Sequence, residues 1–199
     1  MTTARDLTLV VLGLPAERPV AQGDLSLALA GAEAIDLLES GALTLDGDRM
    51  VPGPAAETGD RLLDEAAVSL TRREPYDTVA EWLWRRGGEL AAAYAGELQR
   101  DGLVSHPRGH FGFRSARTVL VDSPARRAAE ERKAAGEPVL AALLAAAGIE
   151  GQPDEAAESP TGDAVTTVLA AVADAVTQLE AVRLRRDVEH AAFDNVWRA

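Results

Sequence analysis

Hydrophobic residues recur along most of the chain every three or four positions, which is the spacing of an amphipathic helix. The clearest stretch runs from 24 to 40, where Gly23-Asp24 opens the segment and Gly41 follows its last apolar residue. The same spacing predicts further helices over residues 57–73, 78–87, 89–100, 124–135, 138–147 and 163–198. Asp77 is the predicted N-cap of the helix over 78–87, because its carboxylate can accept hydrogen bonds from first-turn N–H groups.

Two segments leave the type or the number of elements open. The apolar run from Leu7 to Leu14, which ends at Pro15, fits either a short helix or a buried strand. The region 163–198 carries an apolar face along its whole length and fits either one long helix or two.

Two stretches change from helical spacing to alternation and predict short β-hairpins. Residues 42–51 alternate around Asp46-Gly47, a strong turn signal, and residues 103–113 alternate around a Pro-Arg-Gly turn. The pattern therefore predicts one mainly α-helical globular domain over residues 1–199, with several helices and two short β-hairpins.

Composition narrows the functional classes. The chain has 32 acidic and 20 basic residues and a formal charge of −12, the opposite of the usual balance in a nucleic-acid-binding protein. It has no cysteine, which excludes disulfides, thiol catalysis and Cys-ligated zinc. Its apolar runs fall short of the ~20 residues that a membrane-spanning helix needs, and no signal peptide is evident at the N-terminus. We expect a cytoplasmic protein that does not bind nucleic acid.

Catalytic and metal-binding patterns are weak. His106 and His110 have the spacing of metal ligands on a helix, but they flank a turn and no third ligand accompanies them. Paired acids such as Glu130-Glu131 fit a solvated helix face better than a general acid–base pair. Trp82 and Trp84 lie two apart, so one fits the core and the other its rim. We expect no enzyme, no metal and no cofactor.

The basic residues gather in one region. Residues 102–136 hold seven basic and three acidic residues, whereas each of the other parts of the chain is acidic. One interpretation is a solvated helix with salt bridges to the acidic remainder. The other is a patch for an anionic membrane surface, a phosphate head group or an acidic partner. The candidate patch residues are Arg108, Arg114, Arg117, Arg126 and Arg127.

The order of several segments resembles the Golgi phosphoprotein 3 family, in the shorter form found in actinobacteria. The likeness extends over roughly residues 5–190. Its strongest parts are the segment from Gly31 to Leu45, the sequence Leu63-Asp64-Glu65-Ala66, and Gly102-Leu103-Val104.

The resemblance implies a mostly helical, non-enzymatic, adaptor-type domain that is peripheral to the inner face of the membrane. Eukaryotic members bind phosphatidylinositol 4-phosphate through a loop tryptophan and three arginines. The positions that correspond to those arginines here are Ala30, Gly88 and Ala91. The arginines that could substitute are Arg18, Arg85 and Arg86, which are our candidate head-group ligands.

The expected geometry follows from these candidates. Arg85 and Arg86 should lie near the opening formed by the loop of Arg18 and the N-terminal end of the helix over 24–40. The alternative is that they pair with Asp77, Glu81 or Glu89.

Family members also self-associate through the second hairpin. The resemblance therefore implies a weak homo-oligomer whose interface includes Leu103, Phe111 and Phe113. A short hairpin with aromatic residues has open edges that favour such pairing.

Two other functions stay open. The chain fits a protein-interaction domain without lipid binding. Its helix-then-hairpin order also fits a winged-helix DNA-binding regulator, although a recognition helix near 89–101 would present Glu89, Glu97 and Asp101.

Overall fold

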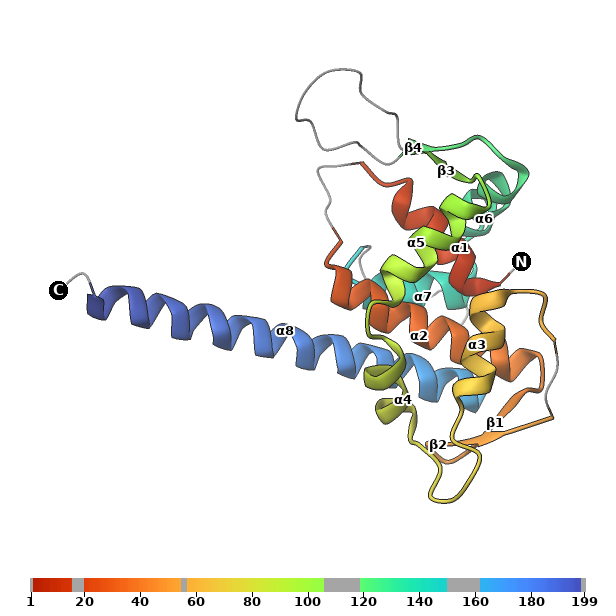
Figure 1. The fold of residues 1–199 in the computed structure, drawn as a ribbon, viewed down its shortest axis with the longest axis horizontal. Coiled ribbons are helices and arrows are strands. Elements are labelled where there is room, and N and C mark those ends of the chain that lie inside the picture. Colours follow the sequence, from red (N-terminus) through yellow and green to blue (C-terminus); the bar gives the residue numbers. More distant parts are fainter. Residues whose placement is uncertain (1, 16–19, 55–56, 106–118, 150–161, 198–199) are drawn as a thin grey trace.

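The structure is a computed structural model that describes residues 2–15, 20–54, 57–105, 119–149 and 162–197. Within these residues the chain forms eight helices and two small antiparallel sheets of two strands each (Figure 1). The predicted mainly α-helical class is confirmed.

The elements follow one another without long interruptions in the described ranges. The helices are α1 (Thr3–Leu12), α2 (Gln22–Glu39), α3 (Arg61–Ser69), α4 (Val79–Arg86), α5 (Leu90–Arg100), α6 (Pro124–Ala134), α7 (Pro138–Ala146) and α8 (Asp163–Trp197). The strands are β1 (Leu43–Asp46), β2 (Arg49–Pro52), β3 (Val104–Ser105) and β4 (Val119–Leu120).

Helix α2 is the centre of the fold. Every residue from Leu25 to Leu37 is buried, because α1, α3, α4, α5, α7 and α8 all pack against it. A helix surrounded on all sides needs small or apolar residues around its whole circumference. Its alanines and Gly31 meet this need, and they allow neighbouring helices to approach closely.

Helix α8 lies across α2 and then leaves the body of the molecule (Figure 1). Its first half is held by contact with α2, α4 and α7. At the crossing, a Cβ on Gly31 would come within 2.3 Å of Cγ2 of Val172, so only glycine allows this approach. The region that fitted either one helix or two is therefore a single helix.

By length and composition alone, α8 from Asp163 to His190 is long and apolar enough to cross a membrane. From the sequence we expected no such helix. The core helix of a soluble protein meets the same criterion, but such a helix is mostly buried, and only 17 % of the qualifying stretch of α8 is buried. The first half of α8 packs against three other helices.

The first hairpin is confirmed. Strands β1 and β2 pair in antiparallel register, with Leu45 opposite Met50, and Gly47 adopts a positive φ of 61° in the turn. In the second sheet, Val104 of β3 pairs with Leu120 of β4. The predicted return strand, Phe111–Phe113, lies outside the described residues.

One open alternative is resolved, and two local predictions are wrong. The run before Pro15 is helical, because Thr2 caps α1 and the helix buries its apolar side chains. Helix α3 is shorter than 57–73, since Asp60 accepts hydrogen bonds from the N–H groups of Leu62 and Leu63 and starts the helix there. The N-cap of α4 is Thr78 instead of Asp77, and it forms a capping box with Glu81.

A buried carboxylate on α2 fixes the start of α1. Asp36 accepts hydrogen bonds from the backbone N–H groups of Thr3 at 2.9 Å and Ala4 at 3.2 Å. Burial raises the pKa of Asp36 from 3.8 to about 6, although both hydrogen bonds favour the ionised form. Between these two pKa values, Asp36 is protonated in the folded protein but ionised in the unfolded chain. The contribution of this group to stability therefore grows as the pH falls through about 6.

Replacing Asp36→Asn removes this titration. We expect the free energy of unfolding of the wild type to rise relative to D36N by up to about 3 kcal/mol between about pH 7 and pH 4. Urea unfolding across this range measures the difference. The exposed Asp48→Asn is the control and should follow the wild type. The same pH dependence in D36N and the wild type would contradict this role for Asp36.

Candidate functional site

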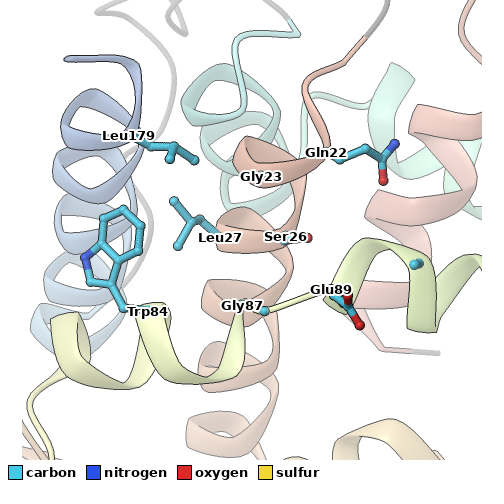
Figure 2. Close-up of a pocket in the computed structure, with 10 residues that line it drawn as sticks. Gln22, Gly23, Ser26, Leu27, Trp84, Gly87, Glu89 and Leu179 are labelled. Carbon is cyan, nitrogen blue, oxygen red and sulfur yellow. The ribbon is translucent and has the colours of Figure 1, made fainter. Parts of the chain in front are cut away.

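A cleft opens where the first turns of α2 meet α4, α5 and α8 (Figure 2). The residues that line it come from these four helices and from the turn between α4 and α5. They are Gln22, Gly23, Ser26, Leu27, Trp84, Gly87, Gly88, Glu89, Ala92 and Leu179.

The walls of the cleft are largely apolar. Figure 2 shows Leu27 of α2 and Leu179 of α8 pointing toward each other, with the indole of Trp84 beside them. Trp84 is 45 % exposed, whereas Trp82 is fully buried and its Nε1 donates a hydrogen bond to the carbonyl of Ala30 at 3.3 Å. The prediction of one core and one rim tryptophan is confirmed.

The first turn of α2 carries free hydrogen-bond donors. Its N-cap, Ala21, offers no side-chain acceptor. The first intrahelical bond of this turn runs from the N–H of Leu25 to the carbonyl of Ala21, so the N–H groups of Gln22, Gly23 and Asp24 have no acceptor in the helix. Such a turn attracts anions, because its N–H groups and the helix dipole both favour negative charge.

An arginine from α8 lies over this turn. Nη1 of Arg183 donates to both carboxylate oxygens of Asp24 at 2.8 Å. Nη2 lies so close to Gly23 that a Cβ there would come within 2.8 Å of it. This second nitrogen has no hydrogen bond to another described residue. The arrangement can therefore offer a guanidinium N–H and backbone N–H groups to one anion.

Two acidic residues oppose that chemistry: Asp24, which already engages Arg183, and Glu89. Glu89 lines the cleft and adopts a left-handed conformation with φ of 59°, at the position before α5. Its side chain makes no capping hydrogen bond. An anion in the cleft would therefore meet repulsive carboxylates as well as the donors on α2 and α8.

Arg86 of our head-group candidates is part of a buried network. Its Nε and Nη2 donate to the carboxylate of Glu33 at 2.8 and 2.9 Å, and Nη2 also donates to the carbonyl of Leu62. The hydroxyl of Tyr94 donates to the same carboxylate at 3.1 Å. Burial raises the pKa of Glu33, although Arg86 acts in the opposite direction. Burial and the nearby Glu33 carboxylate also raise the pKa of Tyr94.

Arg85 is held on the surface of α4. Its guanidinium pairs with Asp77, donates to the carbonyl of Ser69 at 3.2 Å, and lies 5.3 Å from the ring centroid of Trp82. This is the pairing with Asp77 that the sequence left as an alternative. Arg18, the third head-group candidate, lies outside the described residues.

The basic region is described only in part. Arg108, Arg114 and Arg117 lie outside the described residues. Arg126 pairs with Glu130 at 2.7 Å, and Arg127 lies 3.7 Å from Asp122, which fits the interpretation of a solvated helix with salt bridges. In the predicted association hairpin, Leu103 is half-buried and packs against the core, while Phe111 and Phe113 lie outside the described residues.

The structure gives little support for a metal centre among the residues it describes, where no three histidine or acidic side chains are grouped to hold an ion. Both His106 and His110 fall outside the described ranges.

The comparison with family models identifies the family. The model described as Golgi phosphoprotein 3 (GPP34) matches residues 4–196, so the chain belongs to this family. A search of curated proteins found no match. The resemblance seen in the sequence is therefore confirmed at the level of the family.

Of the three positions that the sequence resemblance aligns with the family's arginines, Gly88 lines the cleft, whereas Ala30 and Ala91 are buried. Ala91 donates its N–H to Oγ of Ser26 in the cleft wall at 3.1 Å. Arg183 was not among the predicted site residues. The sequence offers one indication of its role, which is its place one helical turn after Leu179 on the apolar face of the last helix.

The two neighbouring arginines of α4 allow a matched test of the buried network. Arg86→Met leaves the fully buried carboxylate of Glu33 without its counter-ion, so we expect a loss of about 3–5 kcal/mol in the free energy of unfolding. Arg85→Met removes an exposed pair and should lose no more than about 1 kcal/mol. Urea unfolding of both variants measures the contrast. Equal losses would show that the Arg86 pair has no special structural role.

Proposed function

We propose that this chain is a non-enzymatic, adaptor-type domain that binds anionic phospholipid head groups, of the phosphatidylinositol 4-phosphate kind, through an arginine. In this proposal the cleft beside the first turn of α2 receives the phosphate. The domain thereby associates with a membrane surface reversibly and as a peripheral protein.

One observation carries the proposal. The guanidinium of Arg183 lies over the uncapped first turn of α2, beside the cleft. Gly88 lines this cleft, and Ser26 in its wall accepts a hydrogen bond from the N–H of Ala91. The sequence resemblance, which aligns Gly88 with a head-group arginine of the family, supports the same location. Arginine suits this task, because its planar group can donate two parallel hydrogen bonds to phosphate oxygens.

The surroundings of the cleft fit an interfacial ligand. Trp84 is exposed at the rim, and an indole ring is well suited to the boundary between head groups and acyl chains. Opposing this, the chain carries a net charge of −12. We therefore expect weak binding that falls with ionic strength, since each base near an anionic surface contributes only ~1 kcal/mol.

Vesicle co-sedimentation tests the proposal. Phosphatidylcholine vesicles with and without phosphatidylinositol 4-phosphate are compared for the wild type, Arg183→Gln and Glu89→Gln. We expect R183Q to weaken binding by about tenfold, because it removes a charged donor. E89Q should strengthen binding by about fivefold, because it removes a repulsive carboxylate from the cleft.

Arg72→Gln is the matched control, since Arg72 is exposed on the loop after α3 and away from the cleft, and it should bind as the wild type does. Inorganic phosphate and free inositol phosphate are added as competitors, to separate recognition of the head group from recognition of the membrane surface. Unchanged binding by R183Q, with its thermal unfolding also unchanged, would refute this site.

A further inference from the structure

From Leu184 onward, α8 projects from the body and has no partner among the residues that the structure describes (Figure 1). Every described residue from Leu184 to His190 is exposed, and the exposed apolar side chains include Val182, Leu184 and Val188. The helix continues to Trp197, so the projecting part from Leu184 onward is about 21 Å long. A helical segment of this length gains little stability from helix propensity alone.

The stripe of α8 that faces the core continues into this projecting part. Val168, Val172 and Ala175 are buried, and the same alternating steps of three and four residues lead to Val182, Arg186 and Glu189. Phe193 follows at the next position of this register. Apolar residues at steps of three and four form the seam of paired helices. Here Val182 and Phe193 are apolar, and Arg186 and Glu189 occupy the two positions between them.

We propose that this projecting part, together with the adjacent Val182, pairs with the same segment of a second copy of the chain, in antiparallel orientation about a two-fold axis near residues 187–188. In this register Val182 of one copy lies opposite Phe193 of the other. Arg186 of each copy lies opposite Glu189 of the other. The interface is self-complementary, as a two-fold contact between identical chains requires.

The two charged seam positions fix the orientation. A parallel pair would place Arg186 against Arg186 and Glu189 against Glu189, whereas the antiparallel pair places opposite charges together. Among the described residues, neither Arg186 nor Glu189 has an ion pair within its own chain. Both charges are therefore free to pair across the seam.

The charge pattern also favours a second copy over a lipid surface. Between 182 and 190 the helix carries Arg183, Arg185 and Arg186 together with Asp187 and Glu189. Such a mixture gives little net attraction to anionic lipid and is too polar for the membrane interior. Opposite charges at matched positions are what a helix partner of the same sequence needs.

The pairing would bring the C-terminal helix of the second copy close to the proposed lipid-binding cleft. In this register the end of the second copy's helix runs back toward Leu179, which lines the cleft. The inference goes beyond the proposed function and does not depend on lipid binding.

Charge exchange across the seam provides the test, with sedimentation velocity of the full chain from micromolar to submillimolar concentration. The wild type should show a monomer–dimer equilibrium. Arg186→Glu alone places Glu against Glu, and Glu189→Arg alone places Arg against Arg. Each should weaken dimerisation by at least about tenfold. An equimolar mixture of the two variants should form a heterodimer, because its seam pairs are again opposite in charge.

Glu180→Arg is the charge-matched control, because Glu180 is exposed on α8 but off the seam, and it should dimerise as the wild type does. Circular dichroism confirms that each variant is folded. A wild type that stays monomeric would overturn the proposal. So would single variants that still dimerise, which would place association elsewhere, such as the hairpin of Leu103. Vesicle binding that is lost with the R186E change, without dimerisation in the wild type, would assign this helix to a membrane.

Discussion

The buried carboxylate of Glu33 is the constraint on which the arrangement of this fold depends. Because α2 is enclosed on all sides, an ionised group on it needs partners from other helices. Arg86 of α4 supplies the counter-ion and Tyr94 of α5 supplies a hydrogen bond. Asp36, one turn further along α2, is met by the N–H groups that start α1. Two carboxylates on one helix thus position three of its neighbours.

This use of charge inside the fold decides which arginines are available outside it. If Arg86 left Glu33, a buried carboxylate would lose its counter-ion. Arg85 is held by its ion pair with Asp77 and by the face of the Trp82 ring. Arg183 differs, because Asp24 engages only one of its terminal nitrogens. The positions that the sequence resemblance aligns with the family's arginines are Ala30, Gly88 and Ala91 here. We propose that an arginine from α8 supplies their charge at the first turn of α2.

Periodicity predicted the helices and the first hairpin well, because those signals lie within a few residues of one another. The sequence alone could not predict which side chains meet across the fold. Arg86 and Glu33 are 53 residues apart and Arg183 and Asp24 are 159 apart, so nothing local distinguishes these pairs from exposed ones. The same limit explains the run from Leu7 to Leu14, where Asp36, far along the chain, helps to fix a helix. Likewise, the first half of α8 packs against α2, α4 and α7, which lie too far away in the sequence for periodicity to predict the contact.

An NMR titration with inositol phosphate tests most directly whether the cleft beside α2 is the anion site. The amide resonance of Gly23 and the side-chain Nε resonance of Arg183 are followed as ligand is added, with those of Arg85 and Arg86 as internal references. We predict saturable shifts at Gly23 and Arg183, and little change at the two arginines of α4. Shifts confined to Arg85 and Arg86, with Gly23 and Arg183 unmoved, would contradict this assignment.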